Sequence, residues 1–170
     1  MSASMKRVAL VTGSGKKRVG WHVAEALAHR GYDIAVHYRT SSQEAAETIE
    51  HLRSLKVEAV KFQADLANES AVHGLIHGVR DRFGRLDVLV NCAAIYQPKP
   101  LEEVTADDVR HYFDTNLLGS FLCAQQAGLM MVKQPEGGCI VNFGDWALER
   151  PYLNCAAYFA SKGAIPALTR

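Results

Sequence analysis

Three side chains near the end of the sequence have the types and spacing needed for proton transfer. Tyr158 and Lys162 are four residues apart, so on a helix both lie on one face. An ammonium group beside a phenol favours the phenolate, and we therefore expect Lys162 to lower the pKa of Tyr158 toward a range where it can exchange a proton. Asp145 lies thirteen residues before the tyrosine. The sequence predicts a catalytic group of Asp145, Tyr158 and Lys162.

The carboxylate at position 145 bears on the kind of bond that this group can reduce. The negative charge that grows on a carbonyl oxygen needs a hydrogen-bond donor, and an ionised carboxylate donates nothing. Reduction of a C=N bond instead requires a proton on nitrogen, which a carboxylate near a phenol and a lysine can relay. Asp145 therefore favours a C=N substrate over a ketone. The alternative is that Asp145 only caps the turn after a strand, where aspartate is common.

Short apolar runs alternate with helical stretches along the whole chain. The runs that predict buried strands cover residues 8–11, 34–38, 59–62, 86–90 and 140–143. The predicted helices cover residues 20–30, 42–55, 68–83, a short one from 105, 116–132 and 155–170. This alternation implies an α/β fold with a doubly wound parallel sheet of the Rossmann type. Residues 1–170 contain no linker or repeat, and we expect one domain.

Two local signals refine the predicted helices. The segment Ser41-Ser42-Gln43-Glu44 fits a capping box at the start of the second helix. Pro166 lies well inside the last helix, where a proline is expected to kink it or loosen its packing.

A glycine-rich turn, TGSGKKRVG at residues 12–20, follows the first predicted strand and leads directly into a helix. Glycines let the backbone come close to a pyrophosphate, and the helix N-terminus offers N–H groups to the anion. Its place in a βαβ unit strengthens this interpretation. Lys16, Lys17 and Arg18 add positive charge where phosphate would lie, although a solvated basic loop would look the same.

The tip of the second strand predicts which dinucleotide binds. An acidic residue at this position would accept hydrogen bonds from the ribose, whereas an arginine accommodates a 2′-phosphate. The tip, Tyr38-Arg39-Thr40-Ser41, contains no acidic residue. Arg39 and Ser41 therefore favour NADPH over NADH, although Ser41 also fits a helix N-cap.

Composition excludes several classes of function. With 48% hydrophobic and 22% charged residues in 170, the chain is typical of soluble globular proteins with a full core. A net charge of +1 with interleaved signs predicts neither nucleic-acid nor membrane binding. The apolar stretches are too short for a signal peptide or a membrane span. The four cysteines form no CxxC pair, so we expect a reduced, cytoplasmic protein.

The seven histidines form no ligand pattern with an acidic cluster. His73 and His77 have a spacing that can bind metal, but they fit an ordinary surface helix. We expect solvated helix histidines and no metal site.

Several motifs together resemble the short-chain dehydrogenase/reductase family over essentially the whole chain. They are the glycine turn at 12–20, Asp65-Leu66, Asn91-Cys92-Ala93-Ala94, Asn116 and Tyr158-Phe159-Ala160-Ser161-Lys162. In this order and spacing they are highly specific.

The resemblance implies a role for each catalytic residue. Tyr158 would be the proton donor, and Asp145 stands where the family usually carries serine. Lys162 would also bind the nicotinamide ribose, and Asn116 would hold a water in the proton relay behind it.

The resemblance likewise implies the cofactor contacts. Asp65 and Leu66 would contact adenine, and Asn91 and Ala93 would form the turn under the cofactor. Together with the residues predicted above, the cofactor-binding set is Gly13, Lys17, Arg18, Val19, Tyr38, Arg39, Thr40, Ser41, Asp65, Leu66, Asn91, Ala93, Tyr158 and Lys162.

Two departures from the family pattern resemble the pteridine reductase subgroup. Lys17-Arg18-Val19-Gly20 matches its basic turn, which here is one residue longer than the family's usual turn, and Asp145 replaces the serine. Tyr96 stands where the subgroup carries an aromatic residue that stacks on the pterin. The resemblance implies a bacterial dihydropteridine or dihydromonapterin reductase, with the substrate held by Arg18, Tyr96, Asp145 and Tyr158.

Two alternatives stay open. One is a 3-oxoacyl thioester reductase or other carbonyl reductase of the same family. The other is an inactive nucleotide-binding module, because the family normally has roughly 250 residues and the expected last two strands and substrate-covering segment would follow the helix of Tyr158 and Lys162. The sequence ends within that helix, so we expect a domain truncated there. Family members are usually dimers or tetramers, and a homo-oligomer is expected from the resemblance.

Overall fold

The computed structural model describes residues 6–170, and residues 1–5 lie outside the described part. A five-stranded parallel sheet has the order β3-β2-β1-β4-β5. Its strands are β1 (Val8–Val11), β2 (Asp33–Tyr38), β3 (Ala59–Gln63), β4 (Val88–Asn91) and β5 (Cys139–Asn142). The α-helices are α1 (Val19–Ala28), α2 (Ser42–Ser54), α3 (Glu69–Phe83), α4 (Ala106–Tyr112), α5 (Gly119–Met131), α6 (Ala156–Gly163) and α7 (Ile165–Thr169). The predicted doubly wound α/β fold is confirmed.

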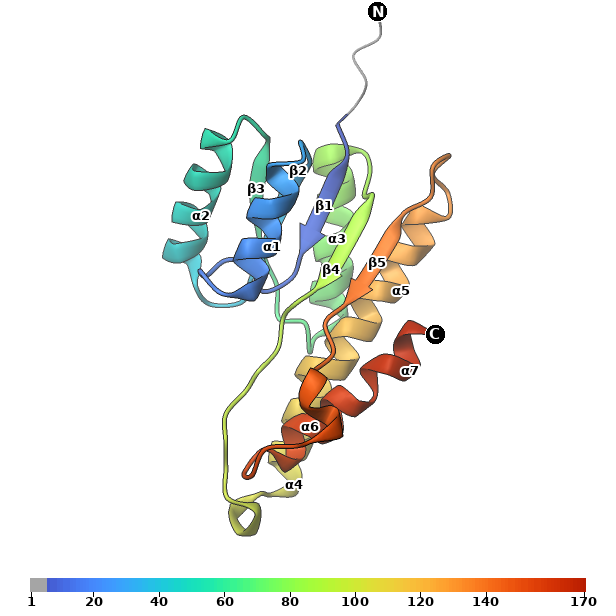
Figure 1. Cartoon of the computed structure of the whole chain (residues 1–170). Helices are drawn as coiled ribbons and strands as arrows, with labels where there is room; N and C mark the ends of the chain where they lie inside the picture. Colours follow the sequence, from blue (N-terminus) through green and yellow to red (C-terminus); the bar gives the residue numbers. More distant parts are fainter. Residues whose placement is uncertain (1–5) are drawn as a thin grey trace, which may run out of the picture.

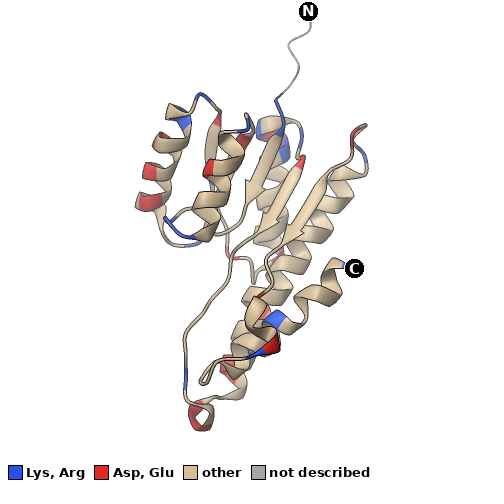
Figure 2. Ribbon diagram, viewed as in Figure 1, with Lys and Arg blue, Asp and Glu red and all other residues tan. Residues whose placement is uncertain are grey.

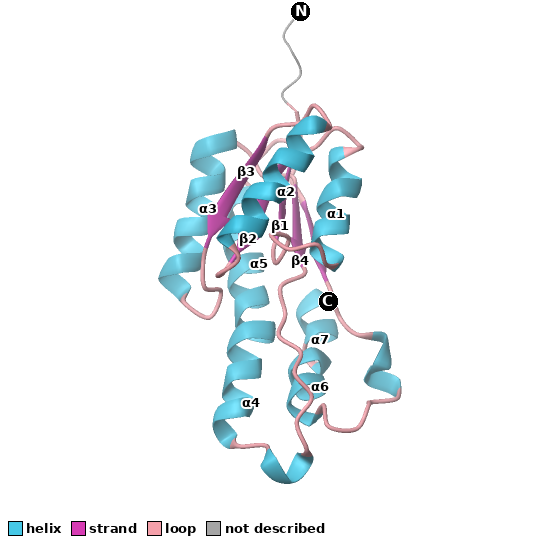
Figure 3. Ribbon diagram, turned by 90° about the vertical axis from the view of Figure 1, so that its left-hand side faces the viewer, coloured by secondary structure: helices cyan, strands magenta, loops and turns pink. Residues whose placement is uncertain are grey.

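Helices cover both faces of the sheet, which explains why the central strand is apolar throughout. Helices α1 and α2 lie on one face, and α3 and α5 lie on the other (Figures 1 and 3). Val8 and Leu10 of β1 pack toward α3 and α5, whereas Ala9 and Val11 pack into the cluster with α1 and α2. All four side chains are therefore buried.

The order of the strands creates a crevice at one end of the sheet. The chain builds outward from β1 to β2 and β3, then returns to place β4 on the other side of β1. At such a switch point the connections after the two neighbouring strands diverge, leaving a crevice beyond their carboxyl ends. The turns after β1 and β4 lie at this point, and α4 and α6 extend beyond the same end of the sheet (Figure 1).

Helices α4 and α5 are parts of one continuous helical segment, where the sequence predicted two separate helices. The start is as expected, since the Thr105 side chain accepts from the Asp108 N–H and the Asp108 carboxylate accepts from the Thr105 N–H. Between them lies a π-helical stretch, η2 (Phe113–Leu118). Single π-helical turns inside α-helices frequently mark functional sites. Asn116 therefore belongs to η2 and not to the first turn of a new helix.

The predicted capping box of α2 does not form. Ser41 is the residue before the helix, but its side chain makes no capping hydrogen bond and its backbone is not extended, with φ −85° and ψ 60°. The carboxylate of Glu44, the other half of the box, instead pairs with Lys16 at 3.0 Å.

The last helical segment is broken as Pro166 predicts. Helix α6 ends at Gly163, and α7 begins at Ile165 with the proline in its first turn. A short 3₁₀ turn, η3 (Trp146–Glu149), precedes α6, and another, η1 (Leu101–Glu103), precedes α4. Helix α7 returns to the sheet, where the Asn142 amide donates to the Thr169 hydroxyl at 3.2 Å.

No helix within residues 6–170 combines the length and the apolar character that a membrane crossing requires.

Candidate active site

The glycines of the turn after β1 are required by close approaches of backbone to backbone. A Cβ on Gly13 would lie 2.9 Å from the Ala93 Cα, and Gly13 has a φ of +69°, which favours glycine. A Cβ on Gly20 would lie 2.9 Å from the Gly13 carbonyl oxygen. Helix α1 then begins at Val19 without a side-chain cap. Its N-terminus is thereby left open to an anion.

The turns after β1 and β4 are joined through a threonine. The Thr12 hydroxyl accepts hydrogen bonds from the N–H groups of Cys92 and Ala93, both at 3.0 Å. Thr12 is fully buried, so its hydroxyl holds the two turns in a fixed relation. These turns form the two walls of the switch-point crevice.

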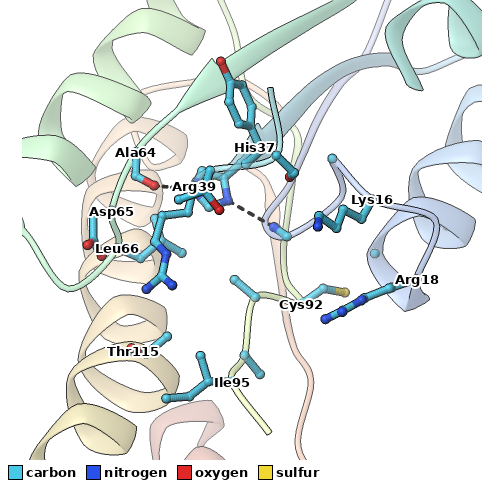
Figure 4. A pocket seen from close by; sticks show the side chains of 18 of the residues that line it. Lys16, Arg18, His37, Arg39, Ala64, Asp65, Leu66, Cys92, Ile95 and Thr115 are labelled. Carbon is cyan, nitrogen blue, oxygen red and sulfur yellow. Dashed lines mark hydrogen bonds between the residues drawn. The ribbon is translucent and has the colours of Figure 1, made fainter. Parts of the chain in front are cut away.

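A cleft of about 400 Å³ occupies this crevice (Figure 4). Its basic residues Lys16 and Arg18 lie in the turn between β1 and α1, where Figure 2 marks a basic segment. Of the predicted cofactor residues, those that line the cleft are Gly13, Arg18, Val19, Tyr38, Arg39, Thr40, Ser41, Asp65, Leu66 and Ala93. Lining residues absent from that predicted set are Gly15, Lys16, Gly20, His37, Ala64, Cys92, Ala94, Ile95 and Thr115.

Four of the predicted cofactor residues do not line this cleft. The Lys17 ammonium lies over the Trp21 ring, 5.0 Å from its centroid, and so faces α1. Asn91 is buried, and its amide donates to the Ser120 carbonyl at 3.1 Å and to the Asn142 side chain at 2.9 Å. Asn91 therefore ties β4 to α5 and β5. Tyr158 and Lys162, the remaining two, lie on α6.

His37 is a cleft residue that was not among the predicted site residues. It lies in β2 and is 3% exposed. Burial lowers the pKa of its ring to about 4, with the Ala64 hydrogen bond and the Asp65 charge acting in the opposite direction. The position of the histidine within a buried apolar run was the available signal.

Tyr158 and Asp145 are in direct contact. The Tyr158 hydroxyl donates to Asp145 Oδ2 at 2.6 Å, and Asp145 Oδ1 accepts from the Ala147 N–H at 2.8 Å. The carboxylate thus caps η3, as the turn-capping alternative predicted, and binds the phenol at the same time. Capping and proton transfer are compatible because one carboxylate has two oxygens.

The expected effect of Lys162 on Tyr158 is wrong for this structure. The pKa of Tyr158 is raised, first by burial and then by the hydrogen bond and charge of Asp145. Lys162 does share the buried face of α6 with Tyr158, but its ammonium donates to the Phe143 carbonyl at 2.7 Å. Burial lowers the pKa of Lys162, and the Asp145 and Cys92 charges oppose that shift. Asp145 therefore holds the phenol in its protonated form.

Asn116 is fully buried, and its side chain is engaged by protein atoms. Its Oδ1 accepts from the Ile95 N–H at 2.8 Å, and its amide donates to the Ile95 carbonyl and to the Ser161 hydroxyl at 3.2 and 3.0 Å. The residue thereby joins η2, the segment after β4 and α6. It positions the helix of Tyr158, while the predicted water-holding role stays a prediction.

One partly exposed aromatic side chain, Tyr96, packs against Tyr158. The Tyr96 ring meets the Tyr158 ring edge to face, with centroids 5.0 Å apart, and about half of the Tyr96 side chain is exposed. Trp146, next to Asp145, is 76% exposed. Tyr96 therefore lies beside the Asp145–Tyr158 pair with part of its side chain exposed.

The residues present fit a dinucleotide with a 2′-phosphate. The glycine turn has the close approaches that only glycine permits, an uncapped helix N-terminus faces the cleft, and Arg39 lines it at the tip of β2. Fold and site together define a dinucleotide-binding α/β domain with an acid–base pair beside its cleft.

Comparison with known proteins identifies the family. A family model described as short chain dehydrogenase matches residues 7–170. The chain is 35% identical over 169 residues to an uncharacterized oxidoreductase of Methylorubrum extorquens, covering 99% of this chain and 66% of that protein. It is 34% identical over 168 residues to a 3-oxoacyl-acyl-carrier-protein reductase of Staphylococcus aureus, covering 98% and 67%. The chain therefore belongs to the short-chain dehydrogenase family and spans about two-thirds of the length of these relatives.

Solved structures agree with this assignment. An acetoin dehydrogenase from Enterobacter cloacae matches with a TM-score of 0.91 and 36% identity, over 98% of this chain and 66% of that one. A short chain dehydrogenase from Burkholderia cenocepacia in complex with NADP matches with a TM-score of 0.88 and 32% identity, over 97% and 66%.

Proposed function

We propose that this chain is the NADPH-binding and catalytic part of a reductase that acts on the C=N bond of a pterin-like substrate. The observation that carries the proposal is the 2.6 Å hydrogen bond from the Tyr158 hydroxyl to the Asp145 carboxylate. A carbonyl reductase needs two hydrogen-bond donors for the growing oxyanion, and a carboxylate at this position supplies none. A C=N substrate needs a proton donor and tolerates a neighbouring negative charge, particularly when it is cationic.

The chemistry of this chain's own residues is proton delivery. When bound, NADPH would supply a hydride to the substrate carbon, while the substrate nitrogen gains a proton. Tyr158 is the proposed donor of that proton, because its hydroxyl carries a proton and is held at 2.6 Å by the Asp145 carboxylate. Asp145 orients the hydroxyl and stabilises positive charge on the substrate nitrogen. Lys162, held by the Phe143 carbonyl, is the proposed ribose contact.

The proposed preference for NADPH rests on the basic side of the cleft. Arg39 and Ser41 line the tip of β2, and no acidic residue occurs there to accept from a ribose 2′-hydroxyl. Lys16 reaches the start of α2, where it pairs with Glu44. Asp65 and Leu66 line the opposite side and are the proposed adenine contacts.

The pterin-like substrate is proposed from shape and chemistry. The exposed face of Tyr96 offers a surface on which a flat heteroaromatic ring can stack next to the Asp145–Tyr158 pair. Arg18 lines the dinucleotide cleft, which Tyr96 does not, and is the proposed second contact.

A carbonyl substrate is the second candidate, because relatives are named as a 3-oxoacyl-acyl-carrier-protein reductase and an acetoin dehydrogenase. A protonated Asp145 would be able to donate to a carbonyl oxygen, and this is the form that such an activity would need.

Residues 1–170 are proposed to act as one NADP-binding domain within a homo-oligomer. The exposed Phe121 and Leu129 on α5 offer an apolar surface suited to a second copy.

The substrate panel that tests the proposal uses NADPH oxidation by the longest natural form of the protein. Dihydrobiopterin and a dihydromonapterin-type compound represent C=N substrates. An acetoacetyl thioester and diacetyl, the diketone that is reduced to acetoin, represent carbonyls. The expected result is a kcat/KM at least about tenfold higher for the dihydropterins, equivalent to about 1.4 kcal/mol of transition-state stabilisation. A higher kcat/KM for the thioester or diketone would overturn the pterin proposal in favour of the carbonyl reductase.

A further inference from the structure

One residue of β2, His37, binds three consecutive N–H groups of the glycine turn. Its Nδ1 accepts from the Gly13 N–H at 3.0 Å. Its carbonyl oxygen accepts from the N–H groups of Ser14 and Gly15 at 3.1 and 3.3 Å. The neighbouring strand β2 thus fixes the backbone of the turn, in addition to the glycines that its close approaches require.

The other ring nitrogen of His37 binds the far wall of the cleft. Its Nε2 lies 3.1 Å from the Ala64 carbonyl oxygen, directly before the proposed adenine contact Asp65. The ring therefore bridges the phosphate side and the adenine side of the cleft, as Figure 4 shows.

These two partners leave the ring only one protonation state. A backbone N–H can only donate and a carbonyl can only accept, so Nδ1 must carry the lone pair and Nε2 the proton. A protonated imidazolium would turn a second donor toward the Gly13 N–H. The ring is accordingly neutral and fixed in one tautomer.

We infer that His37 is a positioning residue for the dinucleotide, acting through its Nδ1 lone pair on the left-handed Gly13. The hydrogen bond holds Gly13 at a φ of +69°, where its Cα packs against Ala93 and the turn leads into the uncapped start of α1. Without that acceptor, the half-buried Gly13 N–H must find water, which moves the turn away from the position of the phosphates. The inference rests on the proposed binding of NADPH.

The charged groups around the cleft do not replace this contact. Lys16, Arg18 and Arg39 line the cleft but offer only donors, so they cannot accept from Gly13. Asp65 is the acidic neighbour, and its charge favours protonation of His37. His37 is thus the side chain that meets the Gly13 N–H with a neutral acceptor.

Two amide variants separate the contacts of the two ring nitrogens. In His37→Asn the amide lies near the position of Nδ1 and its oxygen can accept from Gly13. In His37→Gln the amide lies near the position of Nε2, so the bond to Ala64 can persist while Gly13 loses its acceptor. Each variant removes one contact and retains the other, so each is the control for the other.

The test is NADPH affinity, measured by calorimetry, together with the steady-state KM for NADPH and kcat. The expected result is a Kd near that of the wild type for His37→Asn and a Kd raised about tenfold or more for His37→Gln. In His37→Gln the KM for NADPH should rise in parallel while kcat stays unchanged, because the Asp145–Tyr158 pair is untouched. Equal Kd values for the two variants would overturn the inference, whether both equal the wild type or both are weaker.

A measurement on the wild type keeps the inference testable if a variant fails to fold. Nuclear magnetic resonance of isotope-labelled histidine at near-neutral pH should report the neutral tautomer with its proton on Nε2. A proton on Nδ1, or a charged ring, would overturn the inference. Wild-type protein that binds no NADPH would overturn the proposed function and the inference together, whereas equal Kd values overturn the inference alone.

Discussion

The two halves of this molecule differ in how the groups of the site are held. In the nucleotide half, residues 6–94, the central strand β1 is buried on both faces between helix layers. In the catalytic half, residues 95–170, strand β5 alternates between exposed and half-buried residues, and Val141 is 41% exposed. A small apolar cluster around Tyr158 packs this half. The polar groups of the site are fixed by single hydrogen bonds, such as those of Tyr158 to Asp145 and of Lys162 to the Phe143 carbonyl.

This contrast separates affinity from chemistry. Apolar packing is spread over many contacts and tolerates the loss of one polar group, whereas a hydrogen-bonded pair depends on each partner. Substitutions in the nucleotide half should therefore change stability and cofactor binding. Substitutions of the hydrogen-bonded groups in the catalytic half should change turnover at nearly constant stability.

The largest expected effect is that of removing the Tyr158 hydroxyl. In Tyr158→Phe the proposed proton donor is lost, and kcat should fall by about 10²–10⁴-fold while the Kd for NADPH is unchanged. Steady-state kinetics and calorimetry measure the two quantities. Tyr112→Phe is the matched control, since the Tyr112 ring lies 6.3 Å from that of Tyr158 but its hydroxyl bonds to the Gln97 backbone. A similar fall in kcat for both variants would contradict the assignment of Tyr158.

The next effect concerns stability and compares one strand position in each half. Leu89 in β4 is fully buried, and Leu89→Ala should lower the free energy of unfolding by about 2–5 kcal/mol. Val141→Ala in the exposed strand β5 should lower it by less than about 1 kcal/mol. Urea denaturation followed by circular dichroism gives both values. Equal losses would mean that the sheet is packed as tightly at β5 as at its centre.

Part of this contrast could be predicted from the sequence. The apolar runs of β1 and β4 are local signals that the structure bears out. The parallel, doubly wound sheet followed from the alternation of strands and helices.

What the sequence did not predict depends on contacts between distant residues. Ser41 and Glu44 have the sequence of a capping box, but Lys16 from another turn takes the carboxylate. Lys162 has the right spacing to act on Tyr158, but its ammonium donates to the Phe143 carbonyl. His37 looked like any strand residue, because the N–H that it binds belongs to a turn 24 residues away.

A smaller effect should appear in the acid stability of the nucleotide half. The pKa of His37 is lowered from 6.5 to about 4, so the folded state prefers the neutral ring. Its stabilisation is complete above pH 6.5 and is lost as the pH falls to about 4. The wild type should lose at most about 3 kcal/mol over this interval relative to His37→Asn, which lacks a titrating ring. If the free energies of unfolding of the two proteins changed equally with pH over this interval, a buried neutral histidine would be contradicted.

The most direct test of the central claim, that Asp145 adapts the site to C=N bonds, is the ratio of kcat/KM for dihydropterin to that for an acetoacetyl thioester. It is measured for the wild type, Asp145→Asn and Asp145→Ser with NADPH. Asp145→Asn retains the shape and the acceptor for Tyr158 but removes the charge, and Asp145→Ser supplies a hydroxyl donor. The proposal predicts a high ratio in the wild type that falls about tenfold or more in both variants, with Asp145→Ser gaining activity on the thioester. A ratio that is unchanged by either substitution would contradict the claim.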